Sequence, residues 1–284
     1  MFSAFLPKRA VISLSGEEAI DFLQGLISND ARLLEGGKQI YAALLSPQGR
    51  FLHDFFIIPW RGKIFIDVQA DRATDLLSRL KIYRLRSKIE IRLDESLCVA
   101  ALCGGELDPS EQQDYKIYQD PRLPEMGLRM LGDKNSVSAF FEKNSVKLET
   151  EEQYEHFRLS LGVPDTMDMI VEKSLLLECG FEELHGVDFN KGCYVGQEVT
   201  ARSKFRGQVR KSFYMIKSGL ALPGFGTTIS AGDEIIGEIR TSRRNIGIAL
   251  IYNEKYVLAK SSATPFLCAG VEVEIVPPQW IKEL

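Results

Sequence analysis

Residues 190–198 concentrate the side-chain types that can do chemistry. The sequence N-K-G-C-Y-V-G-Q-E places one thiol, Cys193, among a cation, two glycines, an amide and a carboxylate. Lys191 and a helix that starts near Gly196 would both favour the thiolate form, and therefore nucleophilicity or metal affinity. A single cysteine cannot hold a metal cluster alone, because such clusters need several protein ligands. Cys193 is therefore a reactive thiol, a contact shared with a partner, or a small side chain packed at a helix start.

A basic run follows this segment. Its members are Arg202, Lys204, Arg206, Arg210 and Lys211. Such runs usually form a solvated helix face, but next to a ligand channel this one would attract an anionic ligand or an acidic partner. Direct nucleic-acid binding ranks last, because the net charge of the chain is −4 and only Phe205 and Phe213 accompany the run.

Asp54 is a carboxylate inside the apolar run of residues 51–58. Strand alternation puts it on the same face as Leu52. A carboxylate in such a place either faces a solvent-lined channel or is paired with a cation. In a channel it would position or deprotonate a ligand amine. The alternative is a salt bridge to a residue such as Arg84 or Arg86.

The composition is that of an ordinary soluble protein. The chain has 284 residues, of which 45% are hydrophobic and 26% charged, so it can bury a large core without metals or disulfides. Its five cysteines form no C-x-x-C pair, as expected for reduced thiols in a cytoplasmic protein. Residues 1–9 lack the features of a secretory signal, and no apolar run has the length of a membrane span. We therefore predict no membrane partner, and the histidine spacing predicts no metal site.

The first two thirds of the chain mix strands and helices, which indicates an α+β fold with helices on one side of a sheet. Strands are predicted at 9–14, 39–45, 50–58, 63–68, 88–93, 97–102 and 127–131. Helices are predicted after Ser15, after Asp71, at 137–143 and at 151–161. Ser15 and Glu18 have the spacing of a capping box. Residues 104–135 are otherwise expected to be rich in loops.

The pattern changes after residue 208, where short strands are separated by glycines. Strands are predicted at 211–217, 234–241, 246–252 and 271–276, without a helix. This pattern is typical of a small antiparallel barrel or sandwich. We therefore predict an α+β domain over residues 1–208, which can divide into two subdomains with one near 40–105. Residues 209–284 are predicted to form a C-terminal β-barrel.

The motif K-G-C-Y-V-G-Q-E, with Ala201-Arg202 and Arg206-Gly207 after it, resembles the signature of the YgfZ family. These are folate-binding relatives of the glycine-cleavage T-protein and include mitochondrial iron–sulfur assembly members. The likeness extends to residues 14–30, to 154–164 and to the glycine-punctuated tail. It implies a T-protein-like folate-binding fold, with ferredoxin-like subdomains around a central channel. It also implies tetrahydrofolate as bound ligand, iron–sulfur assembly proteins or iron–sulfur enzymes as partners, and a link to tRNA modification.

Two carboxylates match functional positions of the T-protein. Asp54 ends a segment, 49–54, that is similar to the one carrying the T-protein's functional aspartate. Glu178 lies in a segment, 177–180, that is similar to the one whose glutamate holds the pterin; apart from the resemblance it would be a surface glutamate in a turn. The resemblance implies that residues 190–198 form one wall of a folate channel. The catalytic residues would be Cys193 and Asp54, and the cofactor-binding residues Glu178, Asp54, Lys191, Tyr194, Gln197, Arg202 and Arg206.

Three functions are compatible with these residues. The first is a tetrahydrofolate-binding accessory protein that supports iron–sulfur cluster assembly or repair through the thiol of Cys193. The second is a folate-dependent one-carbon transferase of the aminomethyltransferase type, although the T-protein has no equivalent cysteine. The third is a non-catalytic docking scaffold. Binding of tetrahydrofolate separates the first two from the third.

Overall fold

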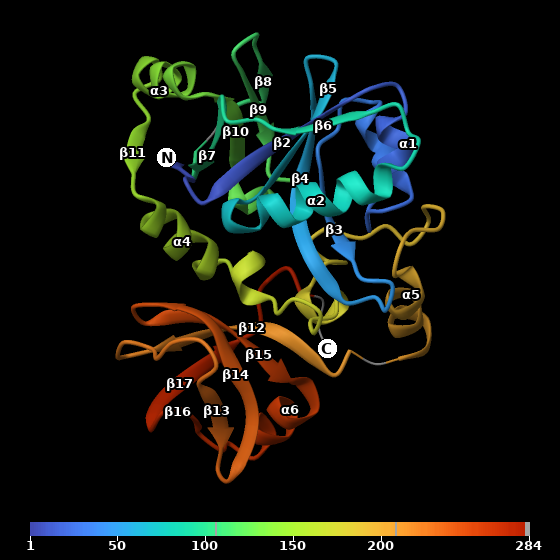
Figure 1. The fold of residues 1–284 in the computed structure, drawn as a ribbon. Helices are drawn as coiled ribbons and strands as arrows, with labels where there is room; N and C mark the ends of the chain where they lie inside the picture. Colours follow the sequence, from blue (N-terminus) through green and yellow to red (C-terminus); the bar gives the residue numbers. More distant parts are fainter. Residues whose placement is uncertain (106, 208, 282–284) are drawn as a thin grey trace.

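The structure is a computed structural model that describes residues 1–105, 107–207 and 209–281, without the side chain of Arg206. Its strands form two open β-sheets and one closed barrel (Figure 1). The two sheets lie side by side in the upper part of the figure, and the barrel lies below them. The predicted boundary at residue 208 falls on a residue outside those described.

The five-stranded sheet is antiparallel throughout. Its order is β3 (Ile40–Leu45), β4 (Phe51–Trp60), β5 (Lys63–Gln69), β2 (Arg9–Ser15) and β6 (Glu90–Leu93). One face carries α1 (Ala19–Gln24), η1 (Ala31–Leu34), η2 (Ala70–Arg72) and α2 (Ala73–Arg84). Leu76 and Leu80 of α2 pack there against Phe55 and Ile57 of β4, so α2 buries the helical stripe that the sequence predicts.

The six-stranded sheet begins with the N-terminal strand. Its order is β11 (Lys147–Glu149), β1 (Phe2–Phe5), β7 (Leu97–Cys103), β10 (Leu128–Asp133), β9 (Tyr115–Gln119) and β8 (Ser110–Glu111), with η3 (Pro124–Met126) between β9 and β10. Only the β1–β11 pair is parallel among the described strands. α3 (Lys134–Lys143) covers one face through Val137 and Phe141. Since β1 and β2 belong to different sheets, the first 15 residues tie the two sheets together.

The closed barrel is antiparallel and confirms the predicted strands. Its order is β12 (Lys211–Ser218), β15 (Ile246–Tyr252), β14 (Glu234–Arg243), β13 (Thr228–Ala231), β16 (Phe266–Cys268) and β17 (Val271–Val276). The prediction of a helix-free tail is wrong, because α6 (Asn253–Ser261) packs its buried Tyr256 and Ala259 against the barrel interior.

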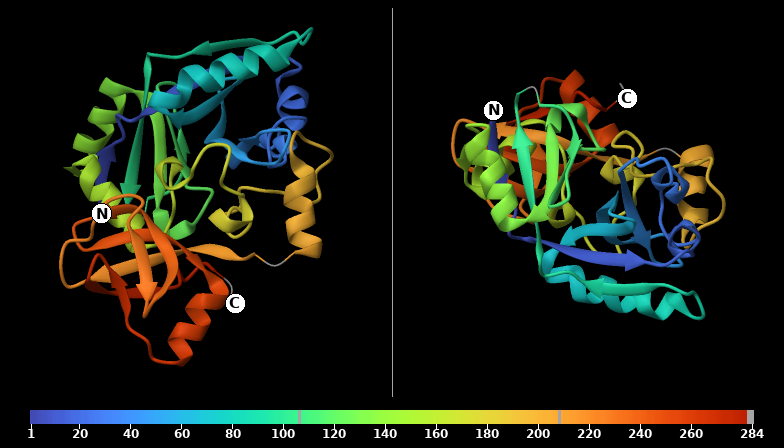
Figure 2. Two further views of the ribbon diagram at one scale, coloured as in Figure 1. Left: turned by 60° about the horizontal axis from the view of Figure 1, so that its bottom comes forward. Right: turned by 90° about the horizontal axis from the view of Figure 1, so that it is seen from above.

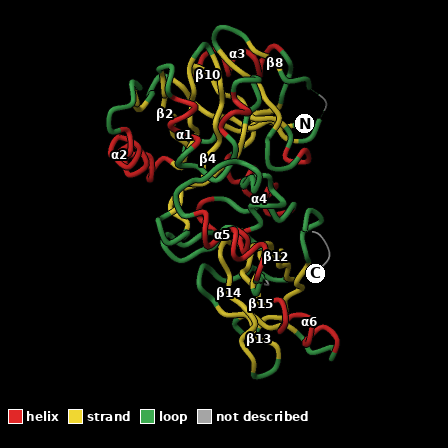
Figure 3. Tube along the Cα trace, turned by 90° about the vertical axis from the view of Figure 1, so that its right-hand side faces the viewer, coloured by secondary structure: helices red, strands yellow, loops and turns green. Residues whose placement is uncertain are grey.

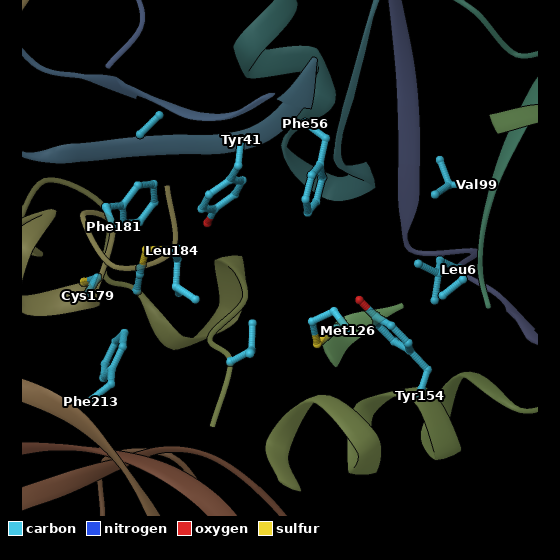
Figure 4. Packing of buried hydrophobic residues seen from close by; sticks show 14 of the residues in the cluster. Leu6, Tyr41, Phe56, Val99, Met126, Tyr154, Cys179, Phe181, Leu184 and Phe213 are labelled. Carbon is cyan, nitrogen blue, oxygen red and sulfur yellow. The ribbon is translucent and has the colours of Figure 1, made fainter. Parts of the chain in front are cut away.

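One hydrophobic core joins all three sheets. Tyr41 and Phe56 come from the five-stranded sheet, Val99 from the six-stranded sheet and Phe213 from the barrel (Figure 4). The segment between α4 (Glu151–Ser160) and α5 (Gln197–Arg206), which includes η4 (Thr166–Asp168) and η5 (Leu177–Cys179), runs among the three sheets (Figure 2). Each sheet also packs a core of its own on its other side.

Two local predictions are wrong. The capping box does not form, because α1 begins at Ala19 and the carboxylate of Glu18 instead accepts the backbone N–H of Lys88 at 3.0 Å. The predicted alternation in β4 fails at its start, because a β-bulge opposite Leu44 and Leu45 shifts the register. Leu52 therefore packs under the helices, on the face opposite to Asp54 and Phe56.

Candidate functional site

A cavity of about 1040 Å³ lies between the two sheets, α4, η4 and barrel strand β14. This volume is of the size that binds a small organic ligand or cofactor. The wall is rich in charge, with more cations than carboxylates. The cations are Lys8, Arg9, Arg72, Arg122, Arg129, Arg158, Arg240 and Arg243, and the carboxylates are Asp71, Glu151, Glu155 and Asp165. The lining side chains thus carry more positive than negative charges, and carboxylates behind the wall pair with several of the cations.

Three arginines surround the ring of Phe56 at the floor of the cavity. The guanidinium carbons of Arg129, Arg122 and Arg9 lie 3.8, 4.8 and 5.4 Å from the ring centroid. Each distance is within the range of a cation–π contact. The aromatic side chain therefore fixes the positions of three buried charges at once.

Two buried carboxylates pair with these three arginines. Asp67 accepts Arg9 Nε at 2.6 Å and Arg129 at 2.5 Å, and Asp120 accepts Arg122 at 2.9 Å. Burial acts to raise the pKa of Asp120, but the charge and hydrogen bonds of Arg122 outweigh it, and the pKa lies below its ordinary value. These arginines are therefore charged and held rigidly by their partners.

Asp54 lies directly behind the cavity wall and is 1% exposed. Its Oδ2 accepts the hydroxyl of Tyr41 at 2.8 Å, and its Oδ1 accepts the hydroxyl of Thr166 at 2.6 Å. Burial, and then the charge of Asp165, raises the pKa of Asp54. The salt bridge considered with Arg84 or Arg86 does not form among the described residues. Thr166 lines the cavity and Asp54 does not.

Asp165 is the carboxylate that faces the cavity at this place. It caps η4 by accepting the backbone N–H of Thr166 at 2.7 Å, and Arg9 lies 3.5 Å from its Oδ1. Burial acts to raise its pKa, but Arg9, Arg158 and Arg122 outweigh it and hold the pKa at about 2. An ionised acceptor thus lies in the wall.

Glu178 lies in η5 and is half-buried. Burial raises the pKa of its carboxyl, while the charges of Lys211, Arg50 and Arg240 act to lower it. Its neighbours Leu176 and Leu177 are in the core, as their apolar character predicts. Glu178 is not among the described residues that line the cavity, although Arg240 beside it is.

Cys193 is exposed, in the loop that precedes α5. This loop and α5 occupy the side of the molecule that faces the viewer in Figure 3. The cavity-lining residues that the structure describes include none from 190–206. The structure therefore does not bring the predicted wall, Asp54 and Glu178 together in one channel.

Lys191 anchors this loop to the end of α1. Its Nζ donates to the backbone carbonyls of Gln24, Ile27 and Asn29 at 2.8, 2.6 and 2.7 Å. The ammonium has three donors, so none is left for the cofactor contact that we predicted. Burial lowers its pKa to about 8, although Asp30 and Asp188 act to raise it. Lys191 therefore holds the loop against the end of α1.

The other predicted cofactor-binding residues of this region also interact locally. Gln197 Oε1 accepts the backbone N–H of Tyr194 at 3.1 Å, just before α5. Tyr194 is half-buried, and burial raises its pKa to about 12. Arg202 is exposed and pairs with Glu198 at 2.9 Å. The side chain of Arg206 lies outside the described part of the chain.

The backbone geometry at Gly196 explains why this position of the motif is a glycine. It has φ +81°, and a Cβ there would lie 2.4 Å from the carbonyl oxygen of Ser46. The backbone at Gly196 thus packs against the β3–β4 turn. Gly192, by contrast, has open space around it.

Sequence reasoning missed the cavity's main residues. Arg129, which lines the cavity, and Asp67, which lies behind its wall, each interrupt a mostly apolar strand, which is the same signal that selected Asp54. Arg240 lies in a strand with several polar residues, which give no such signal. Among the described residues there is no cluster of three or more histidine, cysteine, aspartate or glutamate side chains that could hold a metal. None of the helices within them is long and apolar enough to cross a membrane.

The fold is that of an aminomethyltransferase. The solved structure of glycine cleavage system aminomethyltransferase T from Bartonella henselae matches with a TM-score of 0.77 over 98% of this chain and 86% of that chain, at 17% identity. A family described as "CAF17, C-terminal beta-barrel domain" matches residues 199–283. The predicted α+β fold with a C-terminal barrel is confirmed.

The sequence relatives are iron–sulfur cluster assembly factors named IBA57. The human protein is 27% identical over 97% of this chain and 84% of its own length. The homologues from Neurospora crassa and Mycosarcoma maydis are 33% and 32% identical over 72% and 75% of this chain. The chain spans about half the length of these two fungal relatives, 51% and 57%.

These relatives correct one prediction and confirm another in part. All three are named as mitochondrial proteins, so the predicted cytoplasmic location is wrong. Their names refer to iron–sulfur cluster assembly, as the resemblance implied, and do not mention tRNA modification.

Proposed function

We propose that this chain is a mitochondrial iron–sulfur cluster assembly factor that binds a folate in the central cavity and presents Cys193 to a partner protein. The observation that carries the proposal is the similarity to the human assembly factor over 97% of the chain. The partners we propose are iron–sulfur assembly proteins or the enzymes that receive clusters. Folate binding in the cavity and the contact of Cys193 with a partner can occur at separate places on the protein.

The cavity fits a folate by its chemistry. A pterin offers N–H donors, and the ionised carboxylate of Asp165 in the wall accepts such donors. The surplus of arginines suits the carboxylates of the glutamate tail, and the ring of Phe56 offers an aromatic surface. When bound, a reduced folate would supply a carrier for one-carbon groups. This chain's residues would bind and orient it.

Titration of the whole protein with tetrahydrofolate tests the ligand and the role proposed for Glu178. Binding that Glu178→Ala abolishes, while Glu182→Ala leaves it intact, would support Glu178 as the pterin contact. Binding that survives Glu178→Ala would refute Glu178 as the pterin contact. No binding by the wild-type protein would refute the folate proposal.

Exposure of Cys193 supports its role toward a partner, because an accessible thiol can form a contact outside its own chain. The test is complementation of cells that lack their own relative of this chain, with iron–sulfur enzyme activities as the readout. We expect wild type and Cys98→Ala to restore activity and Cys193→Ala to fail. Full restoration by Cys193→Ala would refute the role of the thiol.

The burial of Asp54 disfavours the one-carbon transferase. A general base must reach the ligand directly or through one water, but Thr166 covers this carboxylate. Incubation with tetrahydrofolate and amine donors should therefore give no methylene-tetrahydrofolate. The third function, a scaffold without ligand, is excluded by any saturable folate binding.

A further inference from the structure

Arg240 in β14 is a buried cation with unused hydrogen-bond donors. Its side chain is 5% exposed and lines the central cavity. One nitrogen pairs with Glu238 at 2.9 Å, but Nε and Nη1 have no partner. A buried donor without a partner costs free energy, so a group that accepts from it would gain affinity. These nitrogens need an acceptor that the described protein does not provide.

The other arginines of the wall have fewer free donors. Among the described residues, Arg72 and Arg129 each leave only Nε without a partner, and each donates through Nη2, to the carbonyl of Leu52 and to Asp67. Arg122 and Arg158 each form bidentate pairs, with Asp120 and Glu155. Arg9 is likewise engaged by a buried carboxylate. Two cations of β14 differ. Arg240 has two nitrogens without a partner, and the exposed Arg243 lines the cavity and donates to the carbonyl of its neighbour Ser242 at 3.0 Å.

We propose that Arg240 and Arg243 form an anion subsite at the barrel side of the cavity, which binds the carboxylates of a folate's glutamate tail. The inference rests on the proposed folate binding and assigns a place to the anionic end of that ligand. Guanidinium groups suit carboxylates because they offer paired donors in one plane. The ring of Phe225, 5.7 Å from Arg240, holds the guanidinium at the cavity rim.

From the sequence, the basic run after residue 201 is a candidate for the place that attracts an anionic ligand. The subsite in β14 would bind that anion instead. Arg202 is exposed and pairs with Glu198, and the described cavity wall contains no residue from that run. Tail recognition by β14 would make the barrel a determinant of specificity for glutamylated folates. A ligand without carboxylates would gain nothing from it.

Calorimetry on the whole protein with three ligands tests the subsite. The ligands are tetrahydropteroate, which lacks glutamate, and tetrahydrofolate with one or with three glutamates. We expect the wild type to bind both glutamylated ligands more tightly than tetrahydropteroate. Arg240→Met should lower the affinity for these two ligands about tenfold to a hundredfold. Affinity for tetrahydropteroate should stay unchanged. Arg244→Met is the matched control, because Arg244 is 76% exposed and is not part of the described cavity wall.

The outcomes separate this inference from the proposed function. Equal wild-type affinity for all three ligands, or equal losses for all three in Arg240→Met, would overturn the subsite while folate binding stands. Failure of the wild type to bind any of them would refute both. If Arg240→Met does not unfold cooperatively, it is not properly folded and cannot test the subsite. The same comparison is then made with Arg243→Met and with the salt dependence of the wild-type affinities. Added salt should lower the affinity for the glutamylated ligands only. An equal loss of affinity for tetrahydropteroate would count against the subsite.

Discussion

Thr166 separates Asp54 from the central cavity, because its hydroxyl donates to Oδ1 of Asp54 at 2.6 Å while Thr166 itself forms part of the wall. The carboxylate that resembles the functional aspartate of the T-protein is thus satisfied by two hydroxyls and hidden. Any effect of Asp54 on a ligand would pass through Thr166.

Thr166→Val should destabilise the protein by about 1–3 kcal/mol, because it leaves one oxygen of a buried carboxylate without its donor. The pKa of Asp54 is already raised, and loss of the hydroxyl would raise it further. A raised pKa gives stability that is present at low pH and lost as pH rises, so the cost should be larger at pH 7 than at pH 4. Urea unfolding measures it. Thr228→Val, on an exposed strand position, is the control, and equal costs for both variants would contradict the prediction.

His53 should make stability depend on pH. Burial lowers its pKa from 6.5 to about 4, and the charge of Arg72 contributes, although Nε2 lies 2.8 Å from Asp75. The unfolded chain therefore binds the proton more tightly, so this contribution is complete above pH 6.5 and is lost toward pH 4. Its full size is about 3 kcal/mol. His53→Gln should flatten the pH dependence of the unfolding free energy across this window. An unchanged slope in His53→Gln would refute the assignment.

Lys191→Met should cost about 2–4 kcal/mol, because three carbonyls at the end of α1 lose a charged donor. Lys204→Met should cost much less, since Lys204 pairs with Glu182 at the surface. Denaturant unfolding gives both values. If Lys191 acts on the ligand instead, the variant would keep its stability and lose folate binding.

Cys193 should be the one thiol of the native protein that reacts rapidly with a disulfide reagent. Cys103, Cys179 and Cys268 are buried and Cys98 is half-buried. We expect one fast equivalent per chain, absent from Cys193→Ser and retained in Cys98→Ser. Two fast equivalents, or none, would show that the loop before α5 is packed differently.

The secondary structure that could be predicted is the part with strong local periodicity. The alternation of β12 and β15 and the apolar stripe of α2 are set by neighbouring residues, and these elements were found. β8 and β9 were not, because residues 104–135 are largely polar and lack the alternation that marks a strand, although β9 pairs with the neighbouring β10 and β8 with β9. The helix α6 was missed because its few buried residues, Tyr256 and Ala259, give a weak pattern.

The site was less predictable because it is assembled from pairs that are far apart in sequence. Asp67 meets Arg9 from 58 residues away and Arg129 from 62. A charge within a mostly apolar strand marks Asp67 and Arg129. The pairing of β2 with β5 brings Arg9 beside Asp67, and Arg129 reaches them from the other sheet. The motif at 190–198 attracted attention through its composition, and three of its residues, Lys191, Gly196 and Gln197, hold the loop in place.

The shared core has a practical consequence for dissecting the protein. Phe213, Ile246, Ile248 and Leu250 point outward from the barrel into the core that Tyr41 and Val99 also occupy. A barrel severed from the chain would expose this apolar strip to water, and such strips promote aggregation. Truncated fragments would therefore aggregate, and measurements of their binding or stability would not describe the folded protein. Such measurements should use the whole chain.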